Sequence, residues 1–250
     1  MTTVLSHYLG DGVQKISLNR PHRLNAIVPE LLDDLIAFLD GANADPRVGA
    51  IVLTGEGRAF CAGDDLKEFN AQISDEKATT AYIERIQDVT RSMMLGARPV
   101  IGAIRGWAAG GGLEWVINCD FAIAALGTRF FFPEISLGVF VTGGVTEILP
   151  RLVGLQRARE MILLGEKFNA GQAKSWGLIR DVVADEALLP TATDLAKRLA
   201  ALPRERVKDV RRIFARPAGA GLEAAMRAET AATVRGFLDP ETAKRVAQFS

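Results

Sequence analysis

The sequence predicts an α/β fold whose carboxyl-terminal third is mostly helical. Two short apolar runs, Ala50–Thr54 and Val100–Arg105, are bounded by glycine or proline and are typical of buried strands. Helical patterns alternate with these runs and dominate from about Thr142 onward. With 250 residues, 48% of them hydrophobic, the chain is long enough to bury a sizeable core in one compact body.

The first 41 residues predict a hairpin followed by an amphipathic helix. Val4–Leu9 and Val13–Leu18 have strand composition, and Gly10–Gly12 between them favours a tight turn. Pro29 then begins a segment in which leucine and isoleucine recur at helical spacing, and Gly41 is expected to end that helix.

The last third of the chain predicts a series of helices. Their expected positions are Arg157–Leu164, Ala170–Trp176, Ala187–Leu202, Glu205–Ala215 and Leu222–Phe237. The stretch Ala215–Gly221 (ARPAGAG) contains proline and glycine, so it is expected to connect two helices. It is too short to separate two folding units.

The composition excludes several classes of function. The 30 basic residues balance 30 acidic ones, so we expect no nucleic-acid partner. No run approaches the roughly 18 apolar residues of a membrane span, and Met1–Gly10 lacks signal-peptide features, which indicates a cytoplasmic protein with no membrane partner. Two cysteines, Cys61 and Cys119, and two histidines provide neither a disulfide framework nor a set of metal ligands.

Two segments, residues 51–65 and 101–112, share a strand, a glycine turn and an expected helix start. The first N–H groups of a helix have no intrahelical partner and glycine permits close approach, so each turn can direct a donor at an anionic oxygen. Two such donors together form an oxyanion hole. The alternative is that the glycines serve only turns and packing, with Asp65 and Glu68 as a helix N-cap and first-turn acid.

Two glutamates have apolar sequence neighbours. Glu114 comes three residues after Gly111, and its own helix pattern favours exposure on a polar face. The alternative is burial with a raised pKa, as acid–base catalysis near neutral pH requires. Glu134 follows Phe130–Pro133, so it is either a first-turn acid after proline or an acid in an apolar site.

Four motifs stand in order along most of the chain. They are Leu18–Ala26 (LNRPHRLNA), Arg58–Leu66 (RAFCAGDDL), Gly106–Asp120 (GWAAGGGLEWVINCD) and Phe132–Gly144 (FPEISLGVFVTGG). Together they resemble the LNRP…NA, FxAGxDL, GxAxGGGxE…CD and PExxxG…GG motifs of the enoyl-CoA hydratase/isomerase (crotonase) superfamily. Several motifs in the same order are far more specific than any one of them.

The resemblance implies a fold and an assembly. The expected fold is a crotonase-like (ClpP/crotonase) spiral of β-β-α repeats over residues 1–195, with a helical trimerisation region over residues 196–250. The expected assembly is a homotrimer or a homohexamer made of two trimers. The chain end Lys244–Phe249 is similar to a basic and aromatic family tail that can reach a neighbouring subunit's site.

The resemblance also implies a site for an acyl-CoA thioester. The backbone N–H groups of Asp64 and Gly111 would hold the thioester oxygen as it becomes enolate-like. Glu114 would activate water and Glu134 would exchange the α-proton, since neither water nor the α-carbon reacts readily unaided. Coenzyme A would enter as part of the substrate, with no tightly bound cofactor and no metal. It would lie against Arg23, Leu24, Ala62, Asp65, Leu66, Lys67 and Gly110.

Retention of both glutamates favours a hydratase acting on a 2-enoyl-CoA. An isomerase is the second reading, because relatives that only isomerise commonly keep the second glutamate and lose the first. Hydrolases, dehalogenases and C–C lyases share the same oxyanion hole, and a non-catalytic CoA-binding scaffold is an alternative of a different class. Asp64 departs from the family, which often has a small neutral residue there. Its carboxylate would oppose an enolate, serve a polar substrate or point away from the site.

Overall fold

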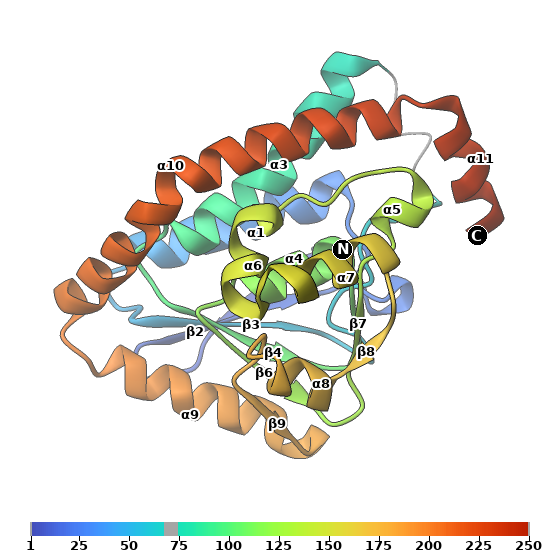
Figure 1. The fold of residues 1–250 in the computed structure, drawn as a ribbon. Coiled ribbons are helices and arrows are strands. Elements are labelled where there is room, and N and C mark those ends of the chain that lie inside the picture. The colour runs from blue at the N-terminus through green and yellow to red at the C-terminus, as the bar shows by residue number, and fades with distance from the viewer. Residues whose placement is uncertain (1, 68–74, 250) are drawn as a thin grey trace.

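The computed structural model describes residues 2–67 and 75–249 and has the predicted α/β architecture (Figure 1). A six-stranded sheet has the order β1-β2-β3-β4-β6-β9, and a three-stranded sheet has the order β5-β7-β8. The larger sheet comprises β1 (Val4–Tyr8), β2 (Val13–Leu18), β3 (Ala50–Gly55), β4 (Val100–Ile104), β6 (Phe121–Ala125) and β9 (Asp181–Val183). The smaller comprises β5 (Trp107–Ala109), β7 (Arg129–Phe131) and β8 (Phe168–Asn169).

The helices surround the larger sheet. They are α1 (Pro29–Ala44), α3 (Glu76–Met94), α4 (Gly111–Asn118), α5 (Glu134–Leu137), α6 (Val145–Val153), α7 (Leu155–Leu164), α8 (Ala170–Ser175), α9 (Leu188–Ala200), α10 (Arg204–Phe237) and α11 (Pro240–Phe249). Two short 3-10 helices are η1 (Pro21–Arg23) and η2 (Asp185–Ala187). In Figure 1, α9 covers one face of the sheet, while α1, α3 and α4 cover the other.

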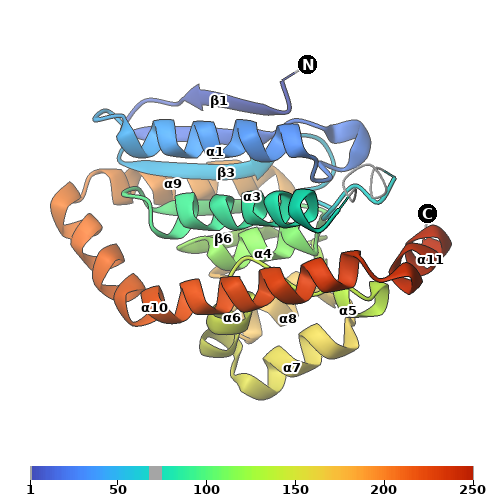
Figure 2. The same ribbon diagram turned by 90° about the horizontal axis from the view of Figure 1, so that it is seen from above.

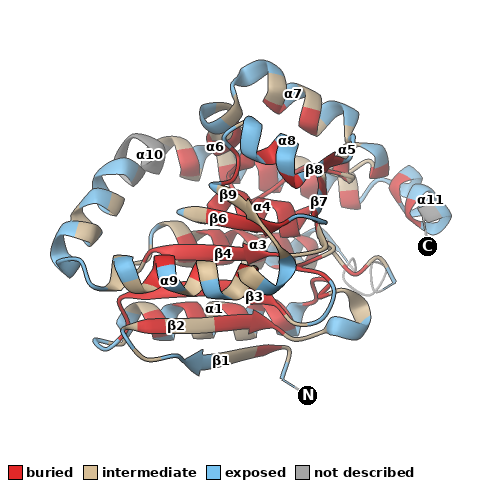
Figure 3. Cartoon of the chain, turned by 90° about the horizontal axis from the view of Figure 1, so that it is seen from below, coloured by how far each residue is buried: buried red, intermediate tan, exposed pale blue. Residues whose placement is uncertain are grey.

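The predicted hairpin and buried strands are confirmed. β1 and β2 pair antiparallel, with Val4 opposite Leu18, and the remaining neighbours in the larger sheet are parallel. Alternation along β3 divides the core: Ile51 and Leu53 pack on the α1 side, whereas Ala50 and Val52 pack with α9. Burial on both faces explains why β3 and β4 are continuous apolar runs (Figure 3).

The end of α1 differs from the sequence prediction. Gly41 does not end α1, which continues to Ala44, because Ala42 is still buried against the core. An internal glycine costs a helix only about 1 kcal/mol, and such packing offsets that cost.

The two helices expected around residues 215–221 are one helix, α10, of 34 residues. Before that stretch, Arg211 donates to the carbonyl of Met93 at 2.6 Å, and after it Leu222 and Met226 are fully buried. Figure 2 shows the two arms of α10 running in different directions, with the longer arm along α3. Tertiary contacts on both arms therefore hold a helix that proline and glycine would weaken in isolation.

Candidate active site

The two glycine turns predicted from the sequence lie in contact. Cys61 forms a parallel bridge with Ala108, and its N–H donates to the carbonyl of Trp107 at 3.0 Å. Gly63 and Gly110 have left-handed φ angles of +85° and +51°. A Cβ atom on Gly63 would lie only 3.0 Å from the carbonyl oxygen of Ala109, so glycine permits this close approach of the two turns.

Each turn carries an N–H group that is available to a ligand. Gly111 is the first residue of α4, where helical geometry supplies no acceptor for its N–H. Within residues 2–67 and 75–249, no backbone acceptor is recorded for the N–H of Asp64 or of Gly111. Two unpaired donors on touching turns provide what an oxyanion hole needs.

Glu114 is buried, with 1% of its surface exposed, so the expectation of an exposed polar face is wrong. All 8 residues of α4 are buried, which leaves this helix without a polar face. The N–H of Thr142 donates to Glu114 Oε1 at 2.7 Å, and the Thr142 hydroxyl donates to Oε2 at 2.6 Å. The carboxyl group is therefore fixed by two hydrogen bonds from one residue.

Glu134 lies beside the second glycine turn. It is the first residue of α5 and is 8% exposed, so it is both a first-turn acid and an acid in an apolar environment. A Cβ atom on Gly110 would lie only 2.7 Å from Glu134 Oε1. Glu134 Oε2 is buried and has no hydrogen-bond partner within the described part of the chain.

The two glutamates differ in acidity because their hydrogen bonds differ. Burial raises the pKa of Glu114 to about 8, against the opposing effect of its two bonds from Thr142. Burial raises the pKa of Glu134 well above its ordinary value, and the charge of Glu114 raises it further. The two bonds from Thr142 favour the ionised form of Glu114, whereas Glu134 Oε2 has no such donor within the described residues, so Glu114 is the acid that ionises more readily.

A buried polar network that the sequence analysis missed holds the turn that carries Thr142. The N–H of Gly143 donates to Gln87 Oε1 at 3.1 Å, and the carbonyl of Gly143 accepts from Asn118 Nδ2 at 2.9 Å. Glu229 of α10 accepts from the N–H of Gly144 at 2.9 Å. Glu229 and Gly144 are 85 residues apart, so no local sequence signal pairs them.

The Asp64 side chain lies in the same region as the two glutamates. The Tyr82 hydroxyl donates to Asp64 Oδ1 at 2.6 Å. Burial raises the pKa of Asp64 to about 6. The Asp64 charge is in turn one of the causes that raise the pKa values of Glu114 and Glu134. The Asp64 carboxyl group therefore lies within electrostatic reach of both glutamates.

The residues expected to contact coenzyme A gather beside the first turn. Asp65 is buried and pairs with Arg20 at 3.1 Å and with Arg23 at 2.5 Å. The N–H of Ala62 donates to the carbonyl of Leu24 at 3.1 Å. The carboxylate of Asp65 thus orients two guanidinium groups, which leaves Arg23 as the partly exposed cation.

Three further residues complete the comparison with the sequence prediction. Leu66 is half-buried and Lys67 is exposed at the end of this loop. Glu68, the alternative first-turn acid, lies outside the described residues.

In the described ranges, no group of three or more histidine, cysteine or acidic residues is arranged to hold a metal ion. No helix in these ranges is long and apolar enough to cross a membrane.

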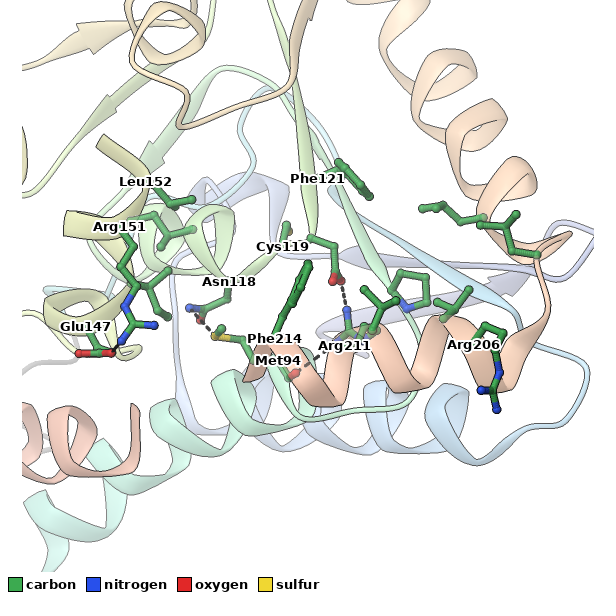
Figure 4. A pocket seen from close by; sticks show the side chains of 18 of the residues that line it. Met94, Asn118, Cys119, Phe121, Glu147, Arg151, Leu152, Arg206, Arg211 and Phe214 are labelled. Atoms are coloured by element: carbon green, nitrogen blue, oxygen red, sulfur yellow. Dashed lines mark hydrogen bonds and ion pairs between the residues drawn. The ribbon is translucent and has the colours of Figure 1, made fainter. Parts of the chain in front are cut away.

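An apolar groove of about 860 Å³ lies elsewhere, between α6, β6 and the first arm of α10 (Figure 4). Its apolar lining includes Met94, Phe121, Leu152, Val207 and Phe214. None of the predicted site residues lines it. The groove is therefore separate from the candidate active site, despite its volume.

The chain belongs to the enoyl-CoA hydratase/isomerase family, whose sequence profile matches residues 9–246. It also resembles a crystal structure of an enoyl-CoA hydratase/isomerase from Pseudoalteromonas atlantica T6c. The TM-score is 0.90 at 26% identity, covering 99% of this chain and 96% of the other. This likeness confirms the predicted crotonase-like fold.

Two curated relatives have different named activities. The mevalonyl-coenzyme A hydratase of Beauveria bassiana is 40% identical over 185 residues, covering 69% of this chain and 66% of that protein. The 1,2-epoxyphenylacetyl-CoA isomerase of Escherichia coli K12 is 38% identical over 205 residues, covering 81% of this chain and 78% of that protein. Both names specify CoA thioesters, whereas the reactions differ.

Proposed function

We propose that the chain is a hydratase that adds water reversibly, in syn fashion, across the 2,3 double bond of an acyl-CoA thioester. The observation that carries this proposal is the unequal pair of buried acids beside two touching glycine turns. Two hydrogen bonds from Thr142 favour ionisation of Glu114, and the unpartnered Oε2 of Glu134 favours its protonated form. Hydration needs one group in each state.

The proposed reaction uses both acids in one turnover. Ionised Glu114 takes a proton from water as the water oxygen bonds to C3 of the substrate. The electron pair of the double bond shifts toward the thioester oxygen, which accepts hydrogen bonds from the N–H groups of Asp64 and Gly111. Protonated Glu134 then gives its proton to C2. A proton passes from Glu114 to Glu134 to restore the starting state.

Coenzyme A is proposed to bind as the carrier of the substrate. Arg23 and Lys67 are the proposed phosphate contacts, with Leu24, Ala62, Asp65, Leu66 and Gly110 as the other contacts. The partly exposed Arg23 guanidinium, held by buried Asp65, supports the first of these assignments. The proposed mechanism assigns no step to a metal ion.

A trimer or a hexamer is the proposed assembly, with residues 196–250 as the trimerisation region. The assembly and the cytoplasmic location remain predictions from the sequence. Sedimentation velocity of the purified protein distinguishes a monomer from a trimer and from a hexamer.

Isomerisation of an enoyl-CoA double bond is the second candidate. Glu134 favours it, because an unpaired buried carboxyl beside the oxyanion turns suits repeated transfer of one proton between two carbons. The isomerase activity named for the E. coli relative is consistent with this reading. Glu114 would then have no assigned chemical task, which ranks isomerisation below hydration.

A panel of 2-enoyl-CoA thioesters tests the proposal. Loss of the conjugated-thioester absorbance with a product heavier by one water supports hydration, whereas unchanged mass with a moved double bond supports isomerisation. We expect Glu114→Gln and Glu134→Gln each to slow hydration by at least about 100-fold. Near-normal rates in both variants would refute the assignment, and tight CoA binding without any turnover would favour a scaffold.

A further inference from the structure

We propose that Asp64 and Tyr82 form a subsite that selects acyl groups carrying a hydroxyl group close to the thioester. This inference rests on the proposed function, because it places the acyl group beside Glu114 and Glu134. It goes further in naming the class of substrate: hydroxylated 2-enoyl-CoA thioesters rather than plain hydrocarbon ones.

The position of Asp64 in the chain places this residue near the acyl end of the proposed substrate. Asp64 forms a parallel bridge with Ile27, and the preceding Gly63 touches Gly110. The backbone N–H of Asp64 is the proposed donor to the thioester oxygen. The charge of its carboxyl group acts on both Glu114 and Glu134, the two acids proposed to act at C3 and C2 of the substrate.

The two carboxylate oxygens of Asp64 have different surroundings. Oδ1 accepts a hydrogen bond from Tyr82, a residue of α3 that is 7% exposed. Oδ2 accepts no hydrogen bond from residues 2–67 or 75–249, and it is not fully buried. Tyr82 thus fixes the orientation of the carboxyl group and leaves one acceptor oxygen open.

An open acceptor next to the thioester discriminates between acyl groups. A hydrocarbon chain would shield Oδ2 from solvent without supplying a hydrogen-bond donor, which disfavours binding of such a chain. A substrate hydroxyl replaces the lost water. A neutral hydroxyl is also cheaper to bury than an ammonium group, so a hydroxyl is the donor that this half-buried position favours.

Matched substrate pairs test the subsite. We would compare 4-hydroxybut-2-enoyl-CoA with but-2-enoyl-CoA, and 5-hydroxypent-2-enoyl-CoA with pent-2-enoyl-CoA. We expect the protein to prefer at least one hydroxylated substrate by at least about tenfold in kcat/KM, as buried hydrogen-bonding sites reject analogues that lack the partner. In Asp64→Ala, which keeps the backbone N–H, this ratio should fall by about tenfold.

Tyr82→Phe provides a second test, since it removes only the hydroxyl that orients Asp64. Its ratio should lie between those of the wild type and Asp64→Ala. Calorimetric binding of the saturated analogues 4-hydroxybutanoyl-CoA and butanoyl-CoA measures the same preference without turnover, and thermal unfolding checks that each variant is folded.

The two levels of the proposal fail in different ways. Absence of hydration with every substrate, in a protein that still binds CoA thioesters, overturns the proposed function. Hydration of both members of each pair at equal kcat/KM, or a ratio that Asp64→Ala does not change, overturns the subsite alone. A preference for the hydrocarbon members in the wild type has the same consequence.

Discussion

Replacing Thr142 with valine should move the pH dependence of hydration to higher pH. The Thr142 hydroxyl donates to Glu114 Oε2 at 2.6 Å, and both residues are buried. A hydrogen bond to a charged group contributes about 1.5–3 kcal/mol, and one pKa unit corresponds to about 1.4 kcal/mol. Loss of this bond should therefore raise the pKa of Glu114 by about one to two units.

The direction follows from the proposed role of Glu114 as the base. The rate rises with pH as Glu114 ionises, so a higher pKa shifts this acid limb toward higher pH. Below the limb, a shift of one unit lowers kcat/KM about tenfold. The Thr142 N–H bond to Oε1, at 2.7 Å, remains in the valine variant and keeps the carboxyl in place.

The assay is kcat/KM for a 2-enoyl-CoA followed by absorbance across the range in which the protein stays folded. Thr142→Ser, which keeps the hydroxyl, is the matched control and should retain the wild-type limb. An unmoved acid limb in folded Thr142→Val would contradict the assignment of Glu114 as the base.

Three other predictions follow from the same geometry. Glu229→Gln should lower the free energy of unfolding, measured in urea, by about 2 kcal/mol. The reason is that an amide NH2 group replaces one of the two carboxylate oxygens that accept hydrogen bonds from backbone N–H groups at the start of α6. Gly110→Ala should slow hydration at least about 100-fold, since its Cβ atom would displace Glu134, whereas Gly127→Ala, with no atom within 4 Å, should keep the wild-type rate. The buried acids have raised pKa values in the folded state, so the unfolded chain releases these protons at lower pH. Stability should therefore fall as pH rises from about 5 to 8, and Glu114→Gln should flatten that slope; an equally steep slope in the variant would refute it.

The parts of the fold that local sequence determines were predictable. The hairpin around Gly10–Gly12 and the buried strands β3 and β4 depend on turn chemistry and on apolar runs that the residues themselves carry. The continuity of α10 was not predictable in this way. It depends on docking of both arms against distant elements, which outweighs the local preference of the ARPAGAG stretch.

The candidate site likewise has parts that the sequence predicts and parts that it does not. Its glycine turns and both glutamates could be selected from motifs, but the burial of Glu114 depends on elements that cover every side of α4. The contributions of Gln87 and Glu229 could not be selected, because they act on a turn that is more than 50 residues away in the chain. Neither composition nor motif spacing identifies side chains and backbone groups that form hydrogen bonds at such a distance in the sequence.

The reach of α10 into the centre of the protein has a consequence for the order of events during synthesis. Glu229 follows every strand of the larger sheet in the sequence, and its carboxylate accepts hydrogen bonds from Gly144 and Thr146 at the start of α6, close to Thr142, which holds Glu114. Chains emerge from the ribosome amino terminus first, so the sheet can form while this carboxylate is still untranslated. The turn that holds Glu114 can therefore take its final form only after the strands of the larger sheet have been translated.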